Sequence, residues 1–254
     1  MINPIALAVN LANYTAISGT MATSGSNTLS NLQSYNNNLY WQSTGSGTQK
    51  VVVDFGAATA ISSIVVDGNN FGSIGATSIA VVGASTSDLS VGTTVISDIK
   101  SSGSLFLSQF PTQTYRYWGL WFIGGTVAPQ MSNLFFGNTL QFTTTYNYGY
   151  KTENNEYITA EKVALDGTLV SAQSYAGRII YEIQFGMQNS AWNTAYKTFL
   201  KTIRGKLNPF YFMDIDGTTL RYMKLDSDYS PVNVSSYGVY NTETLRLKTF
   251  NSNF

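Results

Sequence analysis

The chain has 254 residues with 14 basic and 14 acidic side chains, and it contains neither His nor Cys. Lacking both residue types, it cannot form a Ser–His catalytic pair, a thiol nucleophile, a zinc finger, a haem ligand or an iron–sulfur cluster. The zero net charge argues against a nucleic-acid partner, and the 43% hydrophobic content favours a folded chain.

No cofactor is expected, and a metal site would need the oxygen ligands that bind Ca²⁺ or Mg²⁺. The first eleven residues lack the basic start and the apolar run of a secretion signal. Nowhere do 18 consecutive apolar residues occur, so we expect no membrane span. We therefore expect a chain that is made and folded in the cytoplasm.

The composition changes near residue 137. Before it the basic residues are Lys50, Lys100 and Arg116, and Ser, Thr, Gly and Asn dominate. After it come the other eleven basic residues and most of the Tyr. We expect two domains, residues 1–137 and 138–254, joined without a flexible linker.

In the first domain, short β-branched and aromatic runs are bounded by Gly, Asn, Ser or Asp. They predict strands over residues 50–55, 61–67, 77–83 and 115–123. The class is mainly β, a sandwich or jelly roll. We expect Trp41 and Trp118 to pack in its core.

The second domain alternates strands with one helix. Strands are predicted over residues 140–148, 156–166, 178–187, 208–213, 219–225 and 241–248. Between them, residues 190–206 form one apolar helical stripe, with Ser190 as N-cap and Gly205 as C-terminal stop. The stripe consists of Trp192, Tyr196, Phe199, Leu200 and Ile203. We expect this helix to lie across a β-sheet or barrel.

Six segments of the first domain follow the order of a known family. They are Tyr40–Trp41 and residues 51–56 (VVVDFG), 61–67 (ISSIVVD), 79–84 (IAVVGA), 115–118 (YRYW) and 131–137 (MSNLFFG). This order resembles the discoidin, or coagulation-factor type C, family of galactose-binding-like domains, although its flanking cysteines are missing and Phe55 replaces the usual Leu. The resemblance implies an eight-stranded jelly-roll sandwich that often binds sugars or cell surfaces through loops at one end.

The second domain carries a different set of motifs. They are residues 178–185 (RIIYEIQF), the helix, residues 208–212 (NPFYF), residues 222–226 (YMKLD), and residues 238–240 leading into 244–247 (TLRL). This order is similar to the β-barrel domain of distal tail and minor tail proteins of long-tailed phages. The resemblance implies assembly into a ring, a hexamer or a trimer, with tail tube and hub proteins as further partners.

Two loops of the first domain combine amides with aromatic rings. Amides exchange hydrogen bonds with sugar hydroxyls, and a ring can stack on a pyranose face. Ordinary turn chemistry explains such loops as well, and we favour it over the ligand role. The candidate glycan-binding residues are Tyr35, Asn36, Asn37, Asn38 and Tyr40 in the first loop and Asn69, Asn70 and Phe71 in the second.

Other polar groups favour structural roles. If Arg116 points inward, it needs a carboxylate such as Asp54 or Asp67. Residues 214–217 (DIDG) suggest a hairpin turn, because position 225, where a calcium loop needs Glu, is Leu. A solvated charged face explains the acidic residues of the second domain better than a glycosidase pair does. These are Glu153, Glu156, Glu161 and Glu182. We therefore expect no enzyme.

Together the two resemblances indicate a structural virion protein of a phage tail tip or baseplate. Its second domain would form the ring, and its first domain would project outward and bind a host-surface glycan. Such a protein would leave the host cell by lysis. The alternative is a stand-alone lectin-like adhesin without an assembly role.

Overall fold

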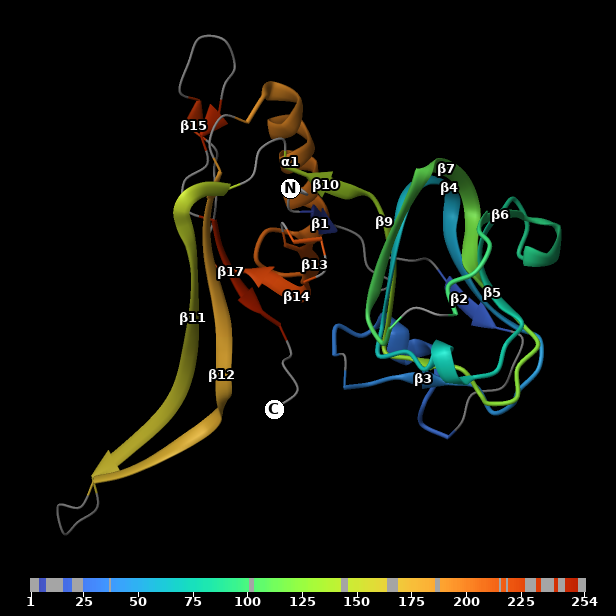
Figure 1. Ribbon diagram of the computed structural model, residues 1–254, viewed down its shortest axis with the longest axis horizontal. Helices are drawn as coiled ribbons and strands as arrows, with labels where there is room; N and C mark the ends of the chain where they lie inside the picture. Colours follow the sequence, from blue (N-terminus) through green and yellow to red (C-terminus); the bar gives the residue numbers. More distant parts are fainter. Residues whose placement is uncertain are drawn as a thin grey trace. The chain divides into compact units, whose positions relative to one another are not determined.

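The computed structural model describes residues 5–7, 16–19, 25–36, 38–100, 103–142, 146–163, 169–185, 188–214, 216–217, 219–226, 232–233, 240–241 and 245–250. The chain divides into two compact units. We call Leu7–Thr139 the sandwich unit, and Met1–Ala6 together with Leu140–Phe254 the helix-bearing unit. The fold is mainly β, a sandwich followed by strands and one α-helix (Figure 1).

The sandwich unit contains short strands around two long ones. The strands are β2 (Ala16–Gly19), β3 (Trp41–Gln42), β4 (Gln49–Asp67), β5 (Ser78–Ala84), β6 (Thr93–Ile96), β7 (Phe106–Ile123), β8 (Gln130–Met131) and β9 (Asn133–Gly137), with 3₁₀ turns η2 (Leu29–Gln33), η3 (Phe71–Ser73) and η4 (Leu89–Val91). One sheet has the order β2-β4-β7-β5-β6, with β9 also paired to β4, and β3 pairs with β8.

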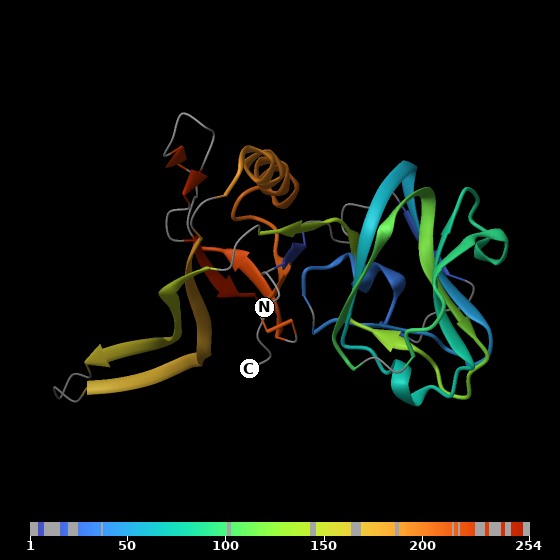
Figure 2. The same ribbon diagram turned by 45° about the horizontal axis from the view of Figure 1, so that its top comes forward.

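The strands β4 and β7 pair antiparallel almost throughout and curve side by side through the unit (Figures 1 and 2). We expected two strands over residues 50–55 and 61–67, but β4 is one strand. A register shift between Asp54 and Thr59 bends it. Gly56 supplies the bend with φ of 76°, and its N–H donates to Asp54 Oδ1 at 2.7 Å.

Both halves of β4 bury side chains in the same core. Val51 and Val53 come from the first half, and Ile61 and Ile64 from the second. Trp41 and Trp118, 2% and 0% exposed, belong to this core as predicted. The two layers of the sandwich are therefore largely two halves of one bent strand pair.

The helix-bearing unit is built on a seven-stranded sheet of order β10-β1-β13-β14-β17-β12-β11. Its elements are β1 (Ile5–Leu7), β10 (Thr139–Gln141), β11 (Tyr146–Val163), β12 (Leu169–Phe185), α1 (Ser190–Ile203), β13 (Phe210–Met213), β14 (Leu220–Leu225), β15 (Val232–Asn233), β16 (Tyr240–Asn241) and β17 (Leu245–Thr249). The turn from β13 to β14 is the predicted hairpin, with Gly217 N–H donating to the Asp214 carbonyl at 3.0 Å.

The N-terminal strand changes the domain boundaries. We expected residues 1–137 and 138–254, but β1 pairs with β13 and lies between β13 and β10. The first six residues therefore belong with the second unit, and the sandwich unit is an insertion between two neighbouring strands of that unit's sheet. Composition missed this because a three-residue strand has no periodicity to detect.

The predicted helix is confirmed with different ends. Asn189, not Ser190, is the N-cap, since its Oδ1 accepts from Trp192 N–H at 2.8 Å. Arg204 and Gly205 both adopt positive φ, and Gly205 N–H donates to the Leu200 carbonyl at 2.9 Å, which ends the helix. No helix in the described part of the chain is long and apolar enough to cross a membrane.

The apolar side of α1 depends on stacked aromatic rings. Trp192 is 3% exposed, and its ring centroid lies 4.9 Å from that of Tyr196 and 5.3 Å from that of Phe142. We predict that Trp192→Ala lowers the free energy of unfolding by about 3–5 kcal/mol, because it leaves a cavity. Thr198→Ala, on the exposed side of α1, is the control and changes it by less than about 0.5 kcal/mol. Chemical denaturation compares the two, and equal losses would contradict this packing.

Candidate functional site

The two predicted glycan loops lie at the same end of the sandwich unit. The second loop joins β8, because Gln130 N–H donates to Asn70 Oδ1 at 2.9 Å. Gln130 in turn pairs with Gln42 of β3, directly after the first loop. The loops, far apart in sequence, therefore meet through the β3–β8 pair, which the sequence did not predict.

The second loop uses its polar groups internally. Asn69 Nδ2 donates to the carbonyls of Gly103 and Ser104 at 3.1 and 2.9 Å, and its Oδ1 accepts from Phe71 N–H at 3.1 Å. Asn70 Nδ2 donates to the Ala128 carbonyl at 3.0 Å. Both amides thus hold neighbouring loops together, and neither has its hydrogen-bonding atoms turned to a ligand.

The ring of Phe71 is also unavailable to a ligand as placed. It is 1% exposed and meets the Phe122 ring edge-on, with centroids 5.2 Å apart. A sugar needs an exposed ring face for stacking. The structure therefore gives Phe71, like the two amides before it, a packing role where we expected ligand contacts.

The first loop presents a short exposed segment. Asn36 Oδ1 accepts from Asn38 N–H at 3.0 Å and its carbonyl accepts from Leu39 N–H at 3.1 Å, which makes a tight turn. Tyr35 and Asn36 are half-buried, and Asn37 lies outside the described residues. Asn38, Leu39 and Tyr40 are exposed, the last two by 41% and 37%. We call these three residues the loop ridge.

The side chain of Asn31 holds the loop ridge through hydrogen bonds to backbone carbonyls. Its Nδ2 donates to the Tyr40 carbonyl at 2.8 Å and to the Ser26 carbonyl at 3.0 Å. Tyr40 itself is exposed, whereas the next residue, Trp41, begins β3 and is buried. Of the eight predicted residues, the loop ridge retains Asn38 and Tyr40 as exposed candidates.

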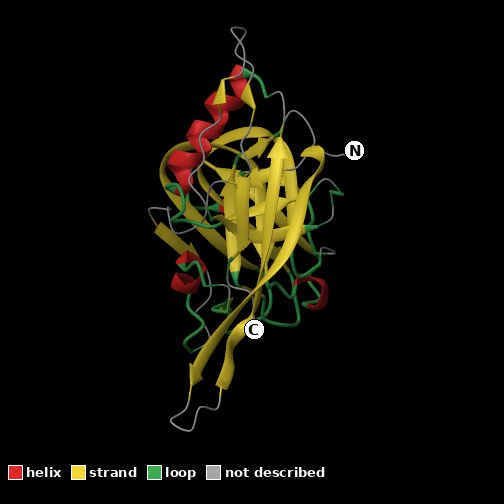
Figure 3. Ribbon diagram, turned by 90° about the vertical axis from the view of Figure 1, so that its left-hand side faces the viewer, coloured by secondary structure: helices red, strands yellow, loops and turns green. Residues whose placement is uncertain are grey.

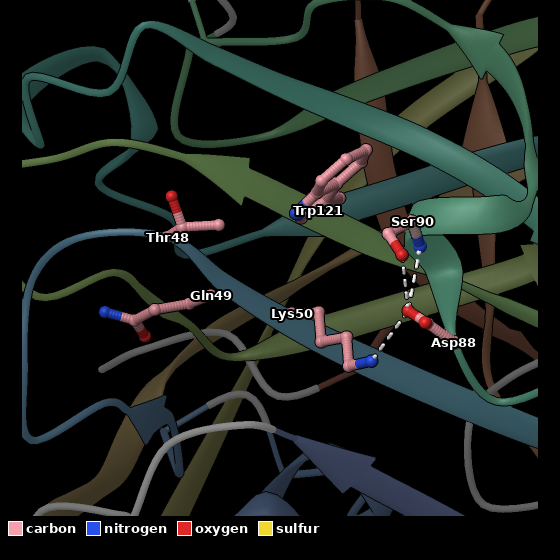
Figure 4. A pocket seen from close by; sticks show the side chains of 6 residues that line it. All are labelled: Thr48, Gln49, Lys50, Asp88, Ser90 and Trp121. Atoms are coloured by element: carbon pink, nitrogen blue, oxygen red, sulfur yellow. Dashed lines mark hydrogen bonds and ion pairs between the residues drawn. The ribbon is translucent and has the colours of Figure 1, made fainter.

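A second candidate surface lies on the sheet, and its lining includes none of the residues of the predicted loops. We call it the sheet pocket; it has a volume of about 230 Å³. Figure 4 shows Trp121, Lys50 and Asp88 gathered around it. Its lining residues are Thr48, Gln49, Lys50, Asp88, Ser90 and Trp121. An aromatic ring beside charged and hydroxyl groups is a combination that can bind a sugar.

Hydrogen bonds fix the polar side of the sheet pocket. Asp88 Oδ1 accepts from Ser90 N–H at 3.1 Å and from Ser90 Oγ–H at 2.9 Å, and it lies 3.3 Å from Lys50 Nζ. These contacts, Ser90 first and Lys50 after it, lower the pKa of Asp88 below its ordinary value. The carboxylate is therefore ionised and acts only as an acceptor near neutral pH.

Sequence reasoning missed this pocket although strand β7 carries a signal for it. In residues 115–123 the buried Trp118, Leu120 and Phe122 alternate with Tyr117 and Trp121. Such alternation places large aromatic rings on both faces of a strand, and the outward ring is the one a ligand can reach. We predicted residues 115–123 as a strand with Trp118 in the core, and assigned no role to Trp121.

Arg116 and Glu182, polar residues for which we predicted structural roles, both form ion pairs. Arg116 contacts Asp54 with two hydrogen bonds, at 2.8 and 2.9 Å, which confirms one of the two expected partners, although the pair points outward. This contact with Arg116 lowers the pKa of Asp54. Glu182 lies 3.7 Å from Arg246 in an ion pair. Among the described residues, no three acidic side chains gather closely enough to hold a metal ion.

The amide of Asn70 offers a direct test of its structural role. Asn70→Ala leaves Gln130 N–H and the Ala128 carbonyl without partners, so we predict a loss of about 1–3 kcal/mol in the free energy of unfolding. Asn38→Ala, in the exposed loop ridge, is the matched control and changes it by less than about 0.5 kcal/mol. Thermal and urea melts compare the stabilities of the two variants. If the Asn70 variant is as stable as the control, these hydrogen bonds do not stabilise the fold.

No family model matches the chain, and no curated protein sequence matches it significantly. Solved carbohydrate-binding modules are similar to about half of it. A chitosan-binding module of a chitosanase/glucanase from Paenibacillus sp. IK-5 matches with 16% identity and a TM-score of 0.43, covering 52% of this chain and 99% of the module.

Two further modules match at a similar level. A CBM32 of AlyQ, solved with 4,5-unsaturated mannuronic acid, has 21% identity and a TM-score of 0.39, covering 48% of this chain and 94% of its own. A pectin-binding module has 11% identity and a TM-score of 0.40, covering 49% and 91%. Similarity at this level does not identify a ligand for this chain.

Proposed function

We propose that this chain is a structural subunit of a phage tail tip or baseplate. The helix-bearing unit joins copies of the chain into a ring, and the sandwich unit binds a glycan on the host surface. The observation that carries the assembly role is the long strand β11 at the edge of its sheet, where the described residues include no strand on its outer side.

β11 has 18 residues and ends its sheet. Its one neighbour among the described strands is β12, whose own other side pairs with β17 only from Ile180 to Ile183. Beyond that point β11 and β12 continue as a two-stranded arm, visible in Figure 3. We call this part, from the Glu156–Arg178 pair outward, the hairpin arm.

An edge strand of this length favours pairing with another chain. Its outward N–H and C=O groups form a row that a further strand can satisfy, and proteins usually shorten or cover such edges. At about 3.3 Å per residue, 18 residues offer roughly 60 Å of edge. If each copy uses this edge to bind a second surface on the next copy, repetition around a rotation axis closes a ring. Closed symmetry is the usual form of soluble oligomers.

A ring would also amplify weak sugar binding. Several sandwich units on one assembly bind a surface together, and avidity of this kind exceeds single-site affinity by roughly 10²–10⁴. The virion location, with tail tube and hub proteins as neighbours, belongs to this proposal. The alternative is a stand-alone lectin-like adhesin, which the exposed Tyr40 of the loop ridge supports equally well because a single module suffices for it.

The assembly role predicts an oligomer that depends on the hairpin arm. Replacing residues 157–177 with an Asn-Gly turn keeps the Glu156–Arg178 pair and removes the arm. We expect the intact chain to have the mass of three or six copies by light scattering, and the arm-less variant to be a monomer with unchanged thermal stability. A monomeric intact chain would contradict the assembly role and favour the adhesin.

The glycan role predicts that the loop ridge contributes a stacking ring. On a glycan array, Tyr40→Ala should weaken binding by about ten-fold, the loss expected when one ring contact is removed. Leu207→Ala, which truncates a 63% exposed side chain of the helix-bearing unit, is the control and should bind normally. Unchanged binding by the Tyr40 variant would exclude the loop ridge as a glycan contact.

A further inference from the structure

In the sheet pocket, a charged side chain and an aromatic ring project from paired positions on one face of the sheet. Lys50 of β4 and Trp121 of β7 are direct partners in the antiparallel register, so their side chains leave the sheet on the same face. This is the face opposite the core, where Val52, Ala80 and Leu89 form a second small apolar cluster. Trp121 is half-buried against that cluster and reaches the pocket.

Gly119 allows the η4 turn to pack closely against this face. A Cβ on Gly119 would lie 2.1 Å from the Val51 carbonyl oxygen and 2.8 Å from Leu89 Cδ1. Only the missing side chain lets Leu89 sit over β7. With Leu89 fixed there, its neighbours Asp88 and Ser90 are held beside Lys50 as a wall of the pocket.

Asp88 has one oxygen committed and one available. Its three contacts, from Ser90 N–H, Ser90 Oγ–H and Lys50 Nζ, all go to Oδ1. Oδ2 has no partner among the described residues, and the side chain is 57% exposed. It can therefore accept a hydrogen bond from a ligand hydroxyl, while the adjacent Lys50 ammonium can donate to a second one.

From this arrangement we propose that the sheet pocket is a carbohydrate site separate from the loop ridge, and that it takes one neutral sugar ring bearing two adjacent hydroxyls. Trp121 stacks on the ring, Asp88 Oδ2 accepts from one hydroxyl, and Lys50 donates to its neighbour. The proposal deepens the glycan-binding half of the proposed function and rests on it; it is independent of the assembly role.

Size and charge give the ligand class. A volume of about 230 Å³ is below the roughly 300–1,000 Å³ of sites for drug-sized ligands, so one ring fits and a chain would continue outside. Lys50 and Asp88 are the charged residues lining the pocket, and together they are neutral. Because Ser90 anchors Asp88, a ligand carboxylate cannot displace it from Lys50 and meets its negative charge instead.

The test uses the full-length chain and matched pairs of sugars. Methyl glycosides of glucose, galactose and mannose are titrated beside the corresponding uronic acids, which differ in the carboxylate alone. Binding to every variant is measured by titration calorimetry. In chains that keep Trp121, NMR on its indole N–H, assigned by its absence in Trp121→Phe, shows whether the sugar binds at the sheet pocket. We expect a neutral glycoside to bind, and its uronic acid to bind at least about five-fold more weakly through repulsion from Asp88.

Four variants separate the pocket from its surroundings. Trp121→Ala should abolish binding, whereas Tyr117→Ala, which removes a ring from the same face outside the pocket, should preserve it. Asp88→Asn should weaken binding by about ten-fold, because it loses a charged hydrogen bond. Asp98→Asn, at the Lys100 ion pair outside the pocket, should bind normally.

Each outcome decides a different point. Equal or tighter binding of the uronic acids overturns the neutral-sugar inference and leaves glycan binding standing. Loss of binding in Tyr40→Ala but not in Trp121→Ala moves the site to the loop ridge and overturns the sheet pocket. No binding of any sugar by the intact chain overturns both this inference and the proposed glycan role.

Discussion

The antiparallel pairing of β4 with β7 is the constraint on which the sandwich unit depends. A continuous ladder fixes which residues of the two strands share a face. Val51, Val53 and Trp118 face inward together. Lys50 and Trp121 are paired with each other at positions of opposite parity, so both face outward. A register slip of one residue would exchange the core and the sheet pocket, and the buried area makes such a slip costly.

Polar residues at the loop end follow a related rule. Loops that approach one another bury backbone groups, and each buried group needs a hydrogen-bond partner. Asn69 and Asn70 supply those partners to two other segments, residues 103–104 and 128–130, which explains why an amide-rich loop here is a structural feature. Asn38, the one amide side chain of the loop ridge, is exposed. This difference in burial separates a candidate ligand residue from residues that hold loops together.

The sandwich unit enters and leaves the other unit through neighbouring strands. Since β1 and β10 lie side by side in the seven-stranded sheet, an inserted domain can vary without breaking that sheet. In the proposed function, this arrangement would let one unit provide assembly contacts while the other binds the glycan. It also means that removing residues 1–137 would remove β1, so a clean excision must keep the first six residues.

The sequence alone determined the mainly β class, the core positions of Trp41 and Trp118, the helix after residue 189 and the hairpin turn at Gly217. Each rests on local chemistry: alternation, ring size, capping and turn preference. Tertiary structure decided which unit's sheet contains β1, and that β4 is one bent strand. It also decided that Phe71 is buried while Trp121 lines a pocket. These depend on contacts between residues far apart in the chain, where the same local pattern fits a packed ring and an accessible one alike.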